Sequence, residues 1–255
     1  MSAKIKMIVT DLDGTLLRDD KTVSEQTKDV LRRCRKIGVK TVFATGRGRS
    51  GENLVPLEFF DGQIVNNGAI AYAGESLIYN SLIKCETLRP LLVACDKRGL
   101  KAAAQRNNVH YSNFDVLKEW EQFREHEIVD FSSFDKETEK MYVLINSQDD
   151  VSFIKDILPS ELYMIVSREG LAMIMHKDAT KSKAVDALAR FWGIDRSEIV
   201  AFGDDVNDID LLFYAGLGIA MGNAVEEVKA ISDFVCLNNE EDGLAHWIMT
   251  NIIAE

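Results

Sequence analysis

Residues 4–17 read KIKMIVTDLDGTLL, and this stretch decides the fold prediction. The apolar run Met7 to Val9 is typical of a buried strand, and two carboxylates follow it, Asp11 and Asp13. In α/β sheets, ligands bind beyond the carboxyl ends of the strands, so this step places two anions in a candidate active site. Two close carboxylates repel each other, and a divalent cation such as Mg2+ relieves the repulsion. For this segment alone, a strand followed by an ordinary turn stays open as the alternative.

Three further sites in the chain carry polar residues that are candidates for the same active site. They are Phe43 to Arg47 (FATGR), Lys181, and Gly203 to Asp208 (GDDVND). Together with Asp11 to Thr15, these segments resemble in order and spacing the four motifs of the haloacid dehalogenase (HAD) superfamily. The whole chain resembles its Cof-type hydrolases. The resemblance implies an α/β fold with a Rossmann-like parallel sheet core, helices on both faces, and an inserted α+β cap domain of the C2B type.

Strand-like and helix-like segments alternate along the chain, which indicates βαβ units and a mostly parallel sheet. We expect buried strands at residues 7–9, 39–44, 199–202 and 217–220, helices at 24–36 and 181–192, and a strand with a hairpin at 63–80. Ser24 is the candidate N-cap of the first helix.

The region from about Cys85 to His176 carries none of the four motifs, and we interpret it as the inserted cap. Strands are expected there at 140–145 and 162–175, the latter a hairpin that turns at residues 168–170. The predicted domains are a core of residues 1–83 and 178–255 and a cap of residues 84–177. Two short crossing strands near residues 84 and 178 are expected to join them.

The composition limits the classes of partner. The chain has 255 residues, 46% hydrophobic and 28% charged, with a formal net charge of −11. Basic patches attract nucleic acids and anionic membranes, so this balance argues against both as partners. The N-terminus shows no signal-peptide pattern, and no apolar run reaches the roughly 18 residues that span a bilayer. Four scattered cysteines indicate reduced thiols in a cytoplasmic protein, and nothing indicates an oligomeric state.

The resemblance assigns roles to the first motif. Asp11 is the expected nucleophile, because a carboxylate can attack a phosphate ester and form an aspartyl-phosphate. Asp13 is expected to protonate the leaving group and then to deprotonate the attacking water, and its main-chain carbonyl is an expected metal ligand. Gly14 is expected to let the backbone approach the phosphate.

The second motif offers neutral hydrogen-bond donors. The Thr45 hydroxyl and the Gly46 N–H are expected to bind a phosphoryl oxygen. An N-cap role for Thr45 in the next helix stays open, and both roles can hold. Arg47 is expected to contact the phosphate or the leaving group, with an ordinary surface ion pair as the alternative. Residues 66–68 (NNG) either line the mouth of the site or form a plain turn.

Lys181 begins the helix expected at 181–192, and apolar residues continue its face at spacings of four, three and four. This periodicity directs Lys181 inward. An anion in front of it, a phosphoryl group or Asp11, would offset its unfavourable place at the start of the helix dipole. Lys183 lies off that face and is expected to be solvated.

The fourth motif completes the expected metal site. Asp204 falls at the end of a strand and is expected to bind Mg2+ together with Asp11 and Asp13. Asp208 is expected behind the metal, where it holds a metal-bound water or orients the motif lysine. The resemblance places Asn207 among the phosphate-binding residues.

Several neighbouring residues have plainer interpretations. Asp205 is expected to be a helix N-cap, and Asp210 a solvated residue on a helix face. The GDDVND segment lacks the glycine and glutamate positions of an EF-hand loop, so calcium sensing fits poorly. The four histidines show no metal-ligand spacing, and residues 179–182 lack the upstream glycine of a P-loop.

Together these observations predict a Mg2+-dependent phosphatase that hydrolyses a small phosphorylated metabolite, with sugar phosphates as the leading class. Two alternatives stay open. One is a phosphomutase-like phosphotransferase, which would pass the phosphoryl group to a sugar hydroxyl instead of water. The other is a catalytically weak HAD-fold binding or regulatory protein.

Overall fold

The computed structural model describes residues 4–120, 125–167 and 170–253, and it divides into two compact units. Unit 1 consists of the described residues up to Asn80 and from Thr180 onward, and unit 2 consists of Ser81–Ala179. The crossings therefore lie at residues 80/81 and 179/180. The expected crossing strands are wrong: apart from an isolated bridge at Ile83, the chain at residues 81–84 and 177–180 has no strand pairing.

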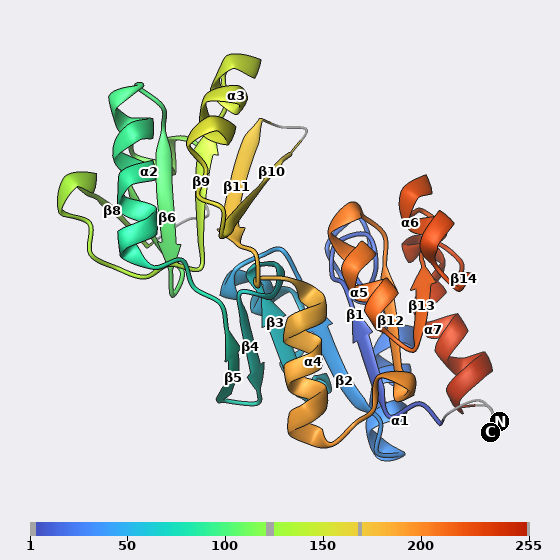
Figure 1. Ribbon diagram of the computed structural model, residues 1–255. Coiled ribbons are helices and arrows are strands. Elements are labelled where there is room, and N and C mark those ends of the chain that lie inside the picture. The colour runs from blue at the N-terminus through green and yellow to red at the C-terminus, as the bar shows by residue number, and fades with distance from the viewer. Residues whose placement is uncertain (1–3, 121–124, 168–169, 254–255) are drawn as a thin grey trace. The chain divides into compact units, whose positions relative to one another are not determined.

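Unit 1 is built on one eight-stranded sheet (Figure 1). Its strands, in order across the sheet, are β14 (Phe234–Val235), β13 (Leu217–Ala220), β12 (Ile199–Gly203), β1 (Met7–Thr10), β2 (Lys40–Ala44), β3 (Gly62–Val65), β4 (Ile70–Ala73) and β5 (Ser76–Asn80). The first six are parallel, and β4 and β5 pair antiparallel to complete a hairpin. β1 lies at the centre and is buried along its whole length, which explains its apolar run from Met7 to Val9.

Helices cover this sheet. They are α1 (Glu25–Lys36), α4 (Lys181–Trp192), α5 (Ile209–Tyr214), α6 (Glu226–Ile231) and α7 (Gly243–Ile248). α4 packs beside α5, and α1 packs beside α7. Ser24 caps α1, with its side chain accepting a hydrogen bond from the Thr27 N–H, and α4 has the bounds that its periodicity predicts. The predicted α/β core with helices on both faces is confirmed.

The described residues of unit 2 form a six-stranded sheet with two α-helices (Figure 1). Its strands, in order, are β10 (Leu162–Val166), β11 (Leu171–His176), β9 (Lys140–Leu144), β6 (Ala102–Arg106), β7 (Val109–Ser112) and β8 (His126–Ile128). The helices are α2 (Cys85–Lys97) and α3 (Gln148–Ile157). β10 and β11 form the expected hairpin, although residues 168–169 of its predicted turn lie outside the described residues.

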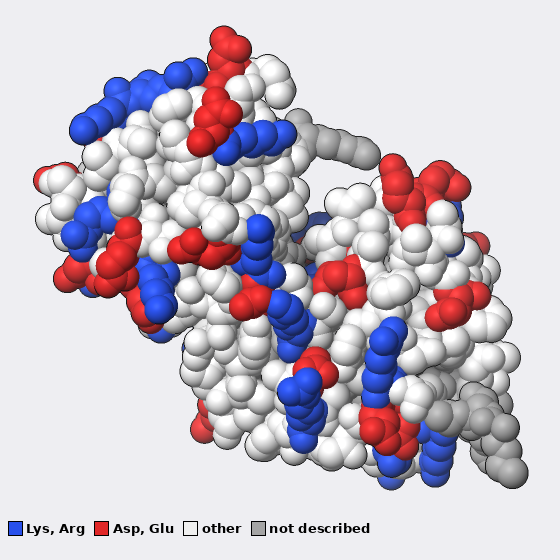
Figure 2. Space-filling model, in the orientation of Figure 1, with Lys and Arg blue, Asp and Glu red and all other residues white. Residues whose placement is uncertain are grey.

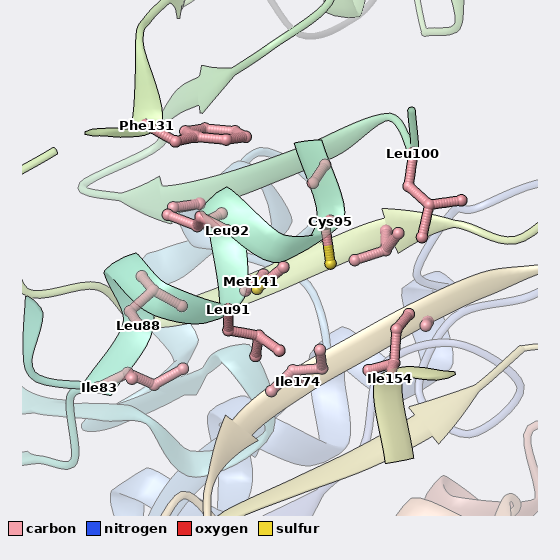
Figure 3. Packing of buried hydrophobic residues seen from close by; sticks show 14 of the residues in the cluster. Ile83, Leu88, Leu91, Leu92, Cys95, Leu100, Phe131, Met141, Ile154 and Ile174 are labelled. Atoms are coloured by element: carbon pink, nitrogen blue, oxygen red, sulfur yellow. The ribbon is translucent and has the colours of Figure 1, made fainter. Parts of the chain in front are cut away.

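The core of unit 2 is apolar and continuous. Leu88, Leu91 and Leu92 of α2 point into the same cluster as Met141 of β9 and Ile174 of β11 (Figure 3). All of these side chains are at most 2% exposed. Burial of this size supplies the dominant favourable free energy of folding, so unit 2 has a hydrophobic core of its own.

Charged side chains of both signs are interspersed on the face that Figure 2 shows. Many form short-range pairs along a helix, such as Asp29 with Arg32 and Arg33 on α1. Exposed pairs of this kind contribute little stability, so the two cores carry most of it. Among the described residues, no helix has the length and apolar character needed to cross a membrane.

Candidate active site

Three predicted motifs meet at one edge of the unit 1 sheet. β1, β2 and β12 are neighbours and run parallel, and Thr10, the last residue of β1, pairs with Phe43 of β2 and Phe202 of β12. Asp11 directly follows β1, and its N–H donates to the Phe202 carbonyl at 3.0 Å. Thr45 and Asp204 directly follow β2 and β12. Because parallel strands end at the same edge of a sheet, residues far apart in sequence come together here.

Lys181 is buried at this edge, with only 1% of its surface exposed. Its Nζ lies 2.5 Å from Asp11 Oδ1 and 2.5 Å from Asp208 Oδ1. Burial alone would lower the pKa of Lys181, but the two carboxylates outweigh it and raise the pKa. The lysine therefore stays charged, and its inward direction agrees with the periodicity of α4.

Carboxylates crowd around this lysine. Asp11, Asp204 and Asp208 each offer an oxygen within 4.8 Å of the others. Burial, reinforced by the neighbouring carboxylates, raises the pKa of Asp11 to about 8 and that of Asp204 to about 7. The single positive charge of Lys181 thus does not balance the negative charge of the three carboxylates. Hard oxygen ligands with uncompensated negative charge fit Mg2+, so the donor set is suitable for the ion that the motifs imply.

The carboxylate of Asp13 contacts two cationic side chains, those of Arg47 and Lys21. Arg47 donates to it through two nitrogens, at 2.6 and 2.8 Å, and Lys21 Nζ lies 2.9 Å away. Burial opposes the effect of these contacts, but the hydrogen bonds from Arg47 and Lys21 lower the pKa of Asp13 to about 2. The carboxylate cluster contains Asp208 where the prediction had Asp13, for which only the main-chain carbonyl was expected as a ligand.

Arg47 forms the ion pair that its alternative interpretation expects, and its contact with a phosphate or leaving group stays a prediction. The Arg47 side chain is 41% exposed, as in a surface pair, yet its partner is the carboxylate of Asp13 in the first motif. Sequence reasoning missed Lys21, which lies in a loop with φ +65°. No periodic pattern marks a loop lysine of this kind.

Thr45 does not cap a helix. The next helical turn begins at Arg49, after Gly48, and no side chain caps it. The N-cap interpretation is therefore wrong. The Thr45 Oγ1 instead accepts the Arg47 N–H at 3.1 Å, and the residue is 1% exposed. A buried hydroxyl at a strand end can still donate its proton to a ligand oxygen.

The turn Asn66–Gly68 joins two motifs. The Asn67 N–H donates to the Thr45 carbonyl at 2.9 Å, and Asn207 Nδ2 donates to Asn67 Oδ1 at 3.0 Å. A Cβ on Gly46 would lie 2.9 Å from that same oxygen, and a Cβ on Gly68 would lie 2.0 Å from the Thr180 carbonyl. The turn therefore packs between the second motif, Asn207 and the start of α4.

Gly14 faces Asp204. Its φ is +77°, and a Cβ there would lie 2.3 Å from Asp204 Oδ2. The next residue, Thr15, donates its hydroxyl to Asp204 Oδ1 at 2.7 Å. The need for glycine thus comes from the backbone conformation and from the close carboxylate, and the approach of a phosphate stays a prediction.

The two remaining acidic predictions have different outcomes. Asp205 accepts the Val206 N–H and caps the turn Val206–Asp208, as predicted. Asp210 is not solvated: it is half-buried, and its Oδ2 accepts the Ser182 N–H at 2.9 Å. α4 and α5 pack together, so Asp210 reaches an unpaired N–H in the first turn of α4.

Comparison with known proteins agrees with this geometry. The chain matches the haloacid dehalogenase-like hydrolases over residues 8–248. It belongs to this family. The predicted resemblance is confirmed, and with it the enzyme class, a HAD-type phosphatase.

Individual relatives align over nearly the whole chain. The 5-amino-6-(5-phospho-D-ribitylamino)uracil phosphatase YitU of Bacillus subtilis is 29% identical over 272 residues, covering 97% of this chain and 98% of YitU. The phosphatase BT1666 from Bacteroides thetaiotaomicron is 27% identical with a TM-score of 0.84, covering 97% and 95% of the two chains. The HAD subclass IIB sugar phosphatase BT4131 is 29% identical with a TM-score of 0.82, covering 96% and 98%.

Proposed function

We propose that this protein is a Mg2+-dependent phosphatase that hydrolyses a small phosphorylated metabolite through an aspartyl-phosphate on Asp11, with a sugar phosphate as the leading substrate class. The observation that carries the proposal is the buried lysine between Asp11 and Asp208, beside a third carboxylate, Asp204. A cluster with raised carboxyl pKa values at the carboxyl edge of a parallel sheet is typical of a functional site.

The first step follows from the position of Asp11. Its carboxylate oxygen attacks phosphorus in line, a bond forms between them, and the bond from phosphorus to the ester oxygen breaks. Lys181 already contacts Asp11 and carries positive charge, so it orients the nucleophile and stabilises charge on the phosphoryl oxygens. Mg2+, held by Asp11, Asp204 and the Asp13 carbonyl, would neutralise charge on the transferred group.

Proton transfer requires Asp13 to exchange partners. While Arg47 and Lys21 hold it, the carboxylate is ionised and suits the second step, in which it deprotonates the attacking water. To act as the acid of the first step it must carry a proton. We propose that the substrate phosphate draws Arg47 away from Asp13, so that binding itself raises the proton affinity of the acid.

We further propose that unit 1 corresponds to the catalytic core, residues 1–83 and 178–255, and unit 2 to a cap, residues 84–177, that governs substrate choice. All the residues with proposed chemical roles belong to unit 1. The substrate class rests on two relatives whose names specify phosphorylated substrates, BT4131 for sugars and YitU for a ribitylaminouracil. A cytoplasmic location and a small-molecule partner belong to the same proposal.

A phosphate-release screen tests this function. The purified chain is assayed with Mg2+ against an aryl phosphate, a panel of sugar phosphates, nucleotides and pyridoxal phosphate. We expect turnover of the aryl phosphate, preference for one or a few sugar phosphates, and loss of activity with EDTA that Mg2+ restores. Isomerisation of a sugar phosphate without phosphate release would favour the phosphomutase. No turnover of any ester by folded, Mg2+-loaded protein would favour the binding protein.

A further inference from the structure

The loop at residues 221–225, between β13 and α6, supports the fourth motif from outside. The Met221 N–H donates to the Gly203 carbonyl at 3.0 Å, and the Val225 N–H donates to the Asp204 carbonyl at 3.0 Å. The loop therefore donates hydrogen bonds to the main-chain carbonyls of Gly203 and of Asp204, the candidate metal ligand. The sequence of this loop, MGNAV, does not by itself indicate that it supports the fourth motif.

Asn223, in the middle of the loop, connects it to the first motif. Its Nδ2 donates to the Gly14 carbonyl at 2.7 Å, and its Oδ1 accepts the Asn239 N–H at 3.0 Å. One side of the amide must donate and the other must accept, so its orientation is determined by its partners. Gly14 lies 209 residues away in the chain.

The contact continues to the metal site. The Gly14 carbonyl held by Asn223 belongs to the peptide that leads into Thr15, and the Thr15 hydroxyl donates to Asp204 Oδ1 at 2.7 Å. The Asn223 side chain thus holds the peptide between Gly14 and Thr15 in place. Thr15 in turn orients Asp204 through its hydroxyl. Groups that orient the ligands of a metal commonly contribute 10- to 100-fold to its affinity.

A second amide anchors the first. Asn239 is 7% exposed, and its Nδ2 donates to the Leu17 carbonyl and to Asp19 Oδ1, both at 3.1 Å. Its main-chain N–H meanwhile holds Asn223. The two asparagines therefore hold residues 14–19, the segment that follows the proposed nucleophile, at both of its ends.

We propose that Asn223 is a positioning residue for the metal site, which acts through the Gly14 peptide and Thr15 on Asp204, with Asn239 as its anchor. The proposal rests on the proposed function for the identity of the ion. Asn223 itself is exposed, so removing its side chain opens no cavity in the core. A loss of Mg2+ affinity in its variants therefore has to come through the hydrogen bond to Gly14.

The test compares Asn223→Ala with Asn238→Ala by calorimetric titration of Mg2+ and by the Mg2+-dependent shift in melting temperature. Asn238 is the matched control, because its side chain caps the turn Asn239–Glu241 and, among the described residues, forms no hydrogen bond with the first motif. We expect the Mg2+ Kd to rise at least about tenfold in Asn223→Ala and to stay within about twofold of wild type in Asn238→Ala.

Asn223→Asp provides a second variant if the alanine protein does not fold. It keeps the acceptor for Asn239 but turns an oxygen toward the Gly14 carbonyl, so we expect the same weakening of Mg2+. Wild-type affinity in a folded Asn223 variant would overturn the inference and leave the proposed function standing. A wild-type protein that binds no Mg2+ would overturn the metal assignment itself, and the inference with it.

Discussion

Asp11 and Asp204 of unit 1 and Asp150 of unit 2 have pKa shifts in opposite directions. In unit 2, burial acts to raise the pKa of Asp150, but hydrogen bonds from Arg98 and from the start of α3 outweigh it and lower the pKa. In unit 1, burial raises the pKa of Asp11 and Asp204, and neighbouring carboxylates add to the rise. The fold thus satisfies the carboxylate of unit 2, which caps a helix. It leaves Asp11 and Asp204 short of positive charge, which is consistent with the proposed binding of a cation there.

The largest test of this contrast is Asp11→Asn, which keeps the shape of the side chain and removes the nucleophile. We expect phosphate release to fall by roughly 10^4-fold or more, because nucleophile knockouts have effects of this order, while the fold persists. Steady-state release of phosphate measures the loss, and circular dichroism checks the fold.

Asp205→Asn is the matched control for that change. It alters a carboxylate of the fourth motif that only caps a turn, and asparagine caps equally well. We expect activity within a few-fold of wild type. Substantial turnover by folded Asp11→Asn would rule out the covalent mechanism.

Lys181→Met should destabilise unit 1 strongly. It leaves Asp11 and Asp208 buried without their cation, a situation that costs about 3–5 kcal/mol. The measurement is urea unfolding at neutral pH without added metal. Lys183→Met, an exposed position two residues on, should change the free energy of unfolding by less than about 0.5 kcal/mol. Equal losses in both variants would mean that the buried ion pairs do not stabilise the cluster.

Much of this site could be predicted from local pattern. The apolar runs before Asp11 and Asp204 are long enough to identify central strands, and parallel strands necessarily end at one edge. The spacing of apolar residues along α4 likewise directs Lys181 inward. Both inferences need only the periodicity of one element.

The missed features depend on tertiary contacts. Asp210 reaches the start of another helix, and Lys21 reaches Asp13 from a loop. Asn223 and Asn239 act on a segment more than 200 residues away. Asn and Asp are favoured at turns and caps for purely local reasons, so their identity alone does not reveal a long-range partner.

Gly14→Ala separates backbone strain from contact with Asp204. Alanine would adopt φ +77° at some cost and would also place a Cβ against the carboxylate. Gly38 has φ +83° with no atom within 4 Å of a Cβ, so Gly38→Ala introduces the strain alone. We expect both variants to lose about 1–2 kcal/mol of stability. Only Gly14→Ala should also weaken Mg2+ binding, by roughly 10- to 100-fold, in a calorimetric titration. An unchanged Mg2+ Kd in Gly14→Ala would show that Asp204 can move aside.

The last effect is the dependence of stability on pH, and its sign should differ between the units. In unit 2, burial lowers the pKa of His110 from its ordinary 6.5 to about 4, with Lys140 and His126 adding to the shift, while its Nδ1 lies 2.8 Å from the Tyr142 hydroxyl. Between pH 6.5 and 4 the unfolded chain therefore binds more protons, and unit 2 loses stability as the pH falls, by about 2 kcal/mol from pH 7 to pH 5. In metal-free unit 1 the raised pKa values of Asp11 and Asp204 mean that the folded state binds more protons, so this pair favours folding as the pH falls from about 8 toward 4.

Amide hydrogen exchange measures the stability of the two units separately. The backbone amides of β7 and β9 report on unit 2, and those of β1 and β12 report on unit 1. His110→Gln keeps a polar group beside Tyr142 and removes the titration, and comparison with wild type at the same pH cancels the intrinsic exchange rate. We expect the variant to keep its protection in β7 and β9 at pH 5 where wild type loses it, with no difference in β1 and β12. If instead the β7 and β9 amides of the wild type exchanged like those of the variant at pH 7 and at pH 5, the folded protein would not hold His110 neutral. The two units would then differ in the pKa shifts of their carboxylates, but His110 would not add to the difference in pH dependence.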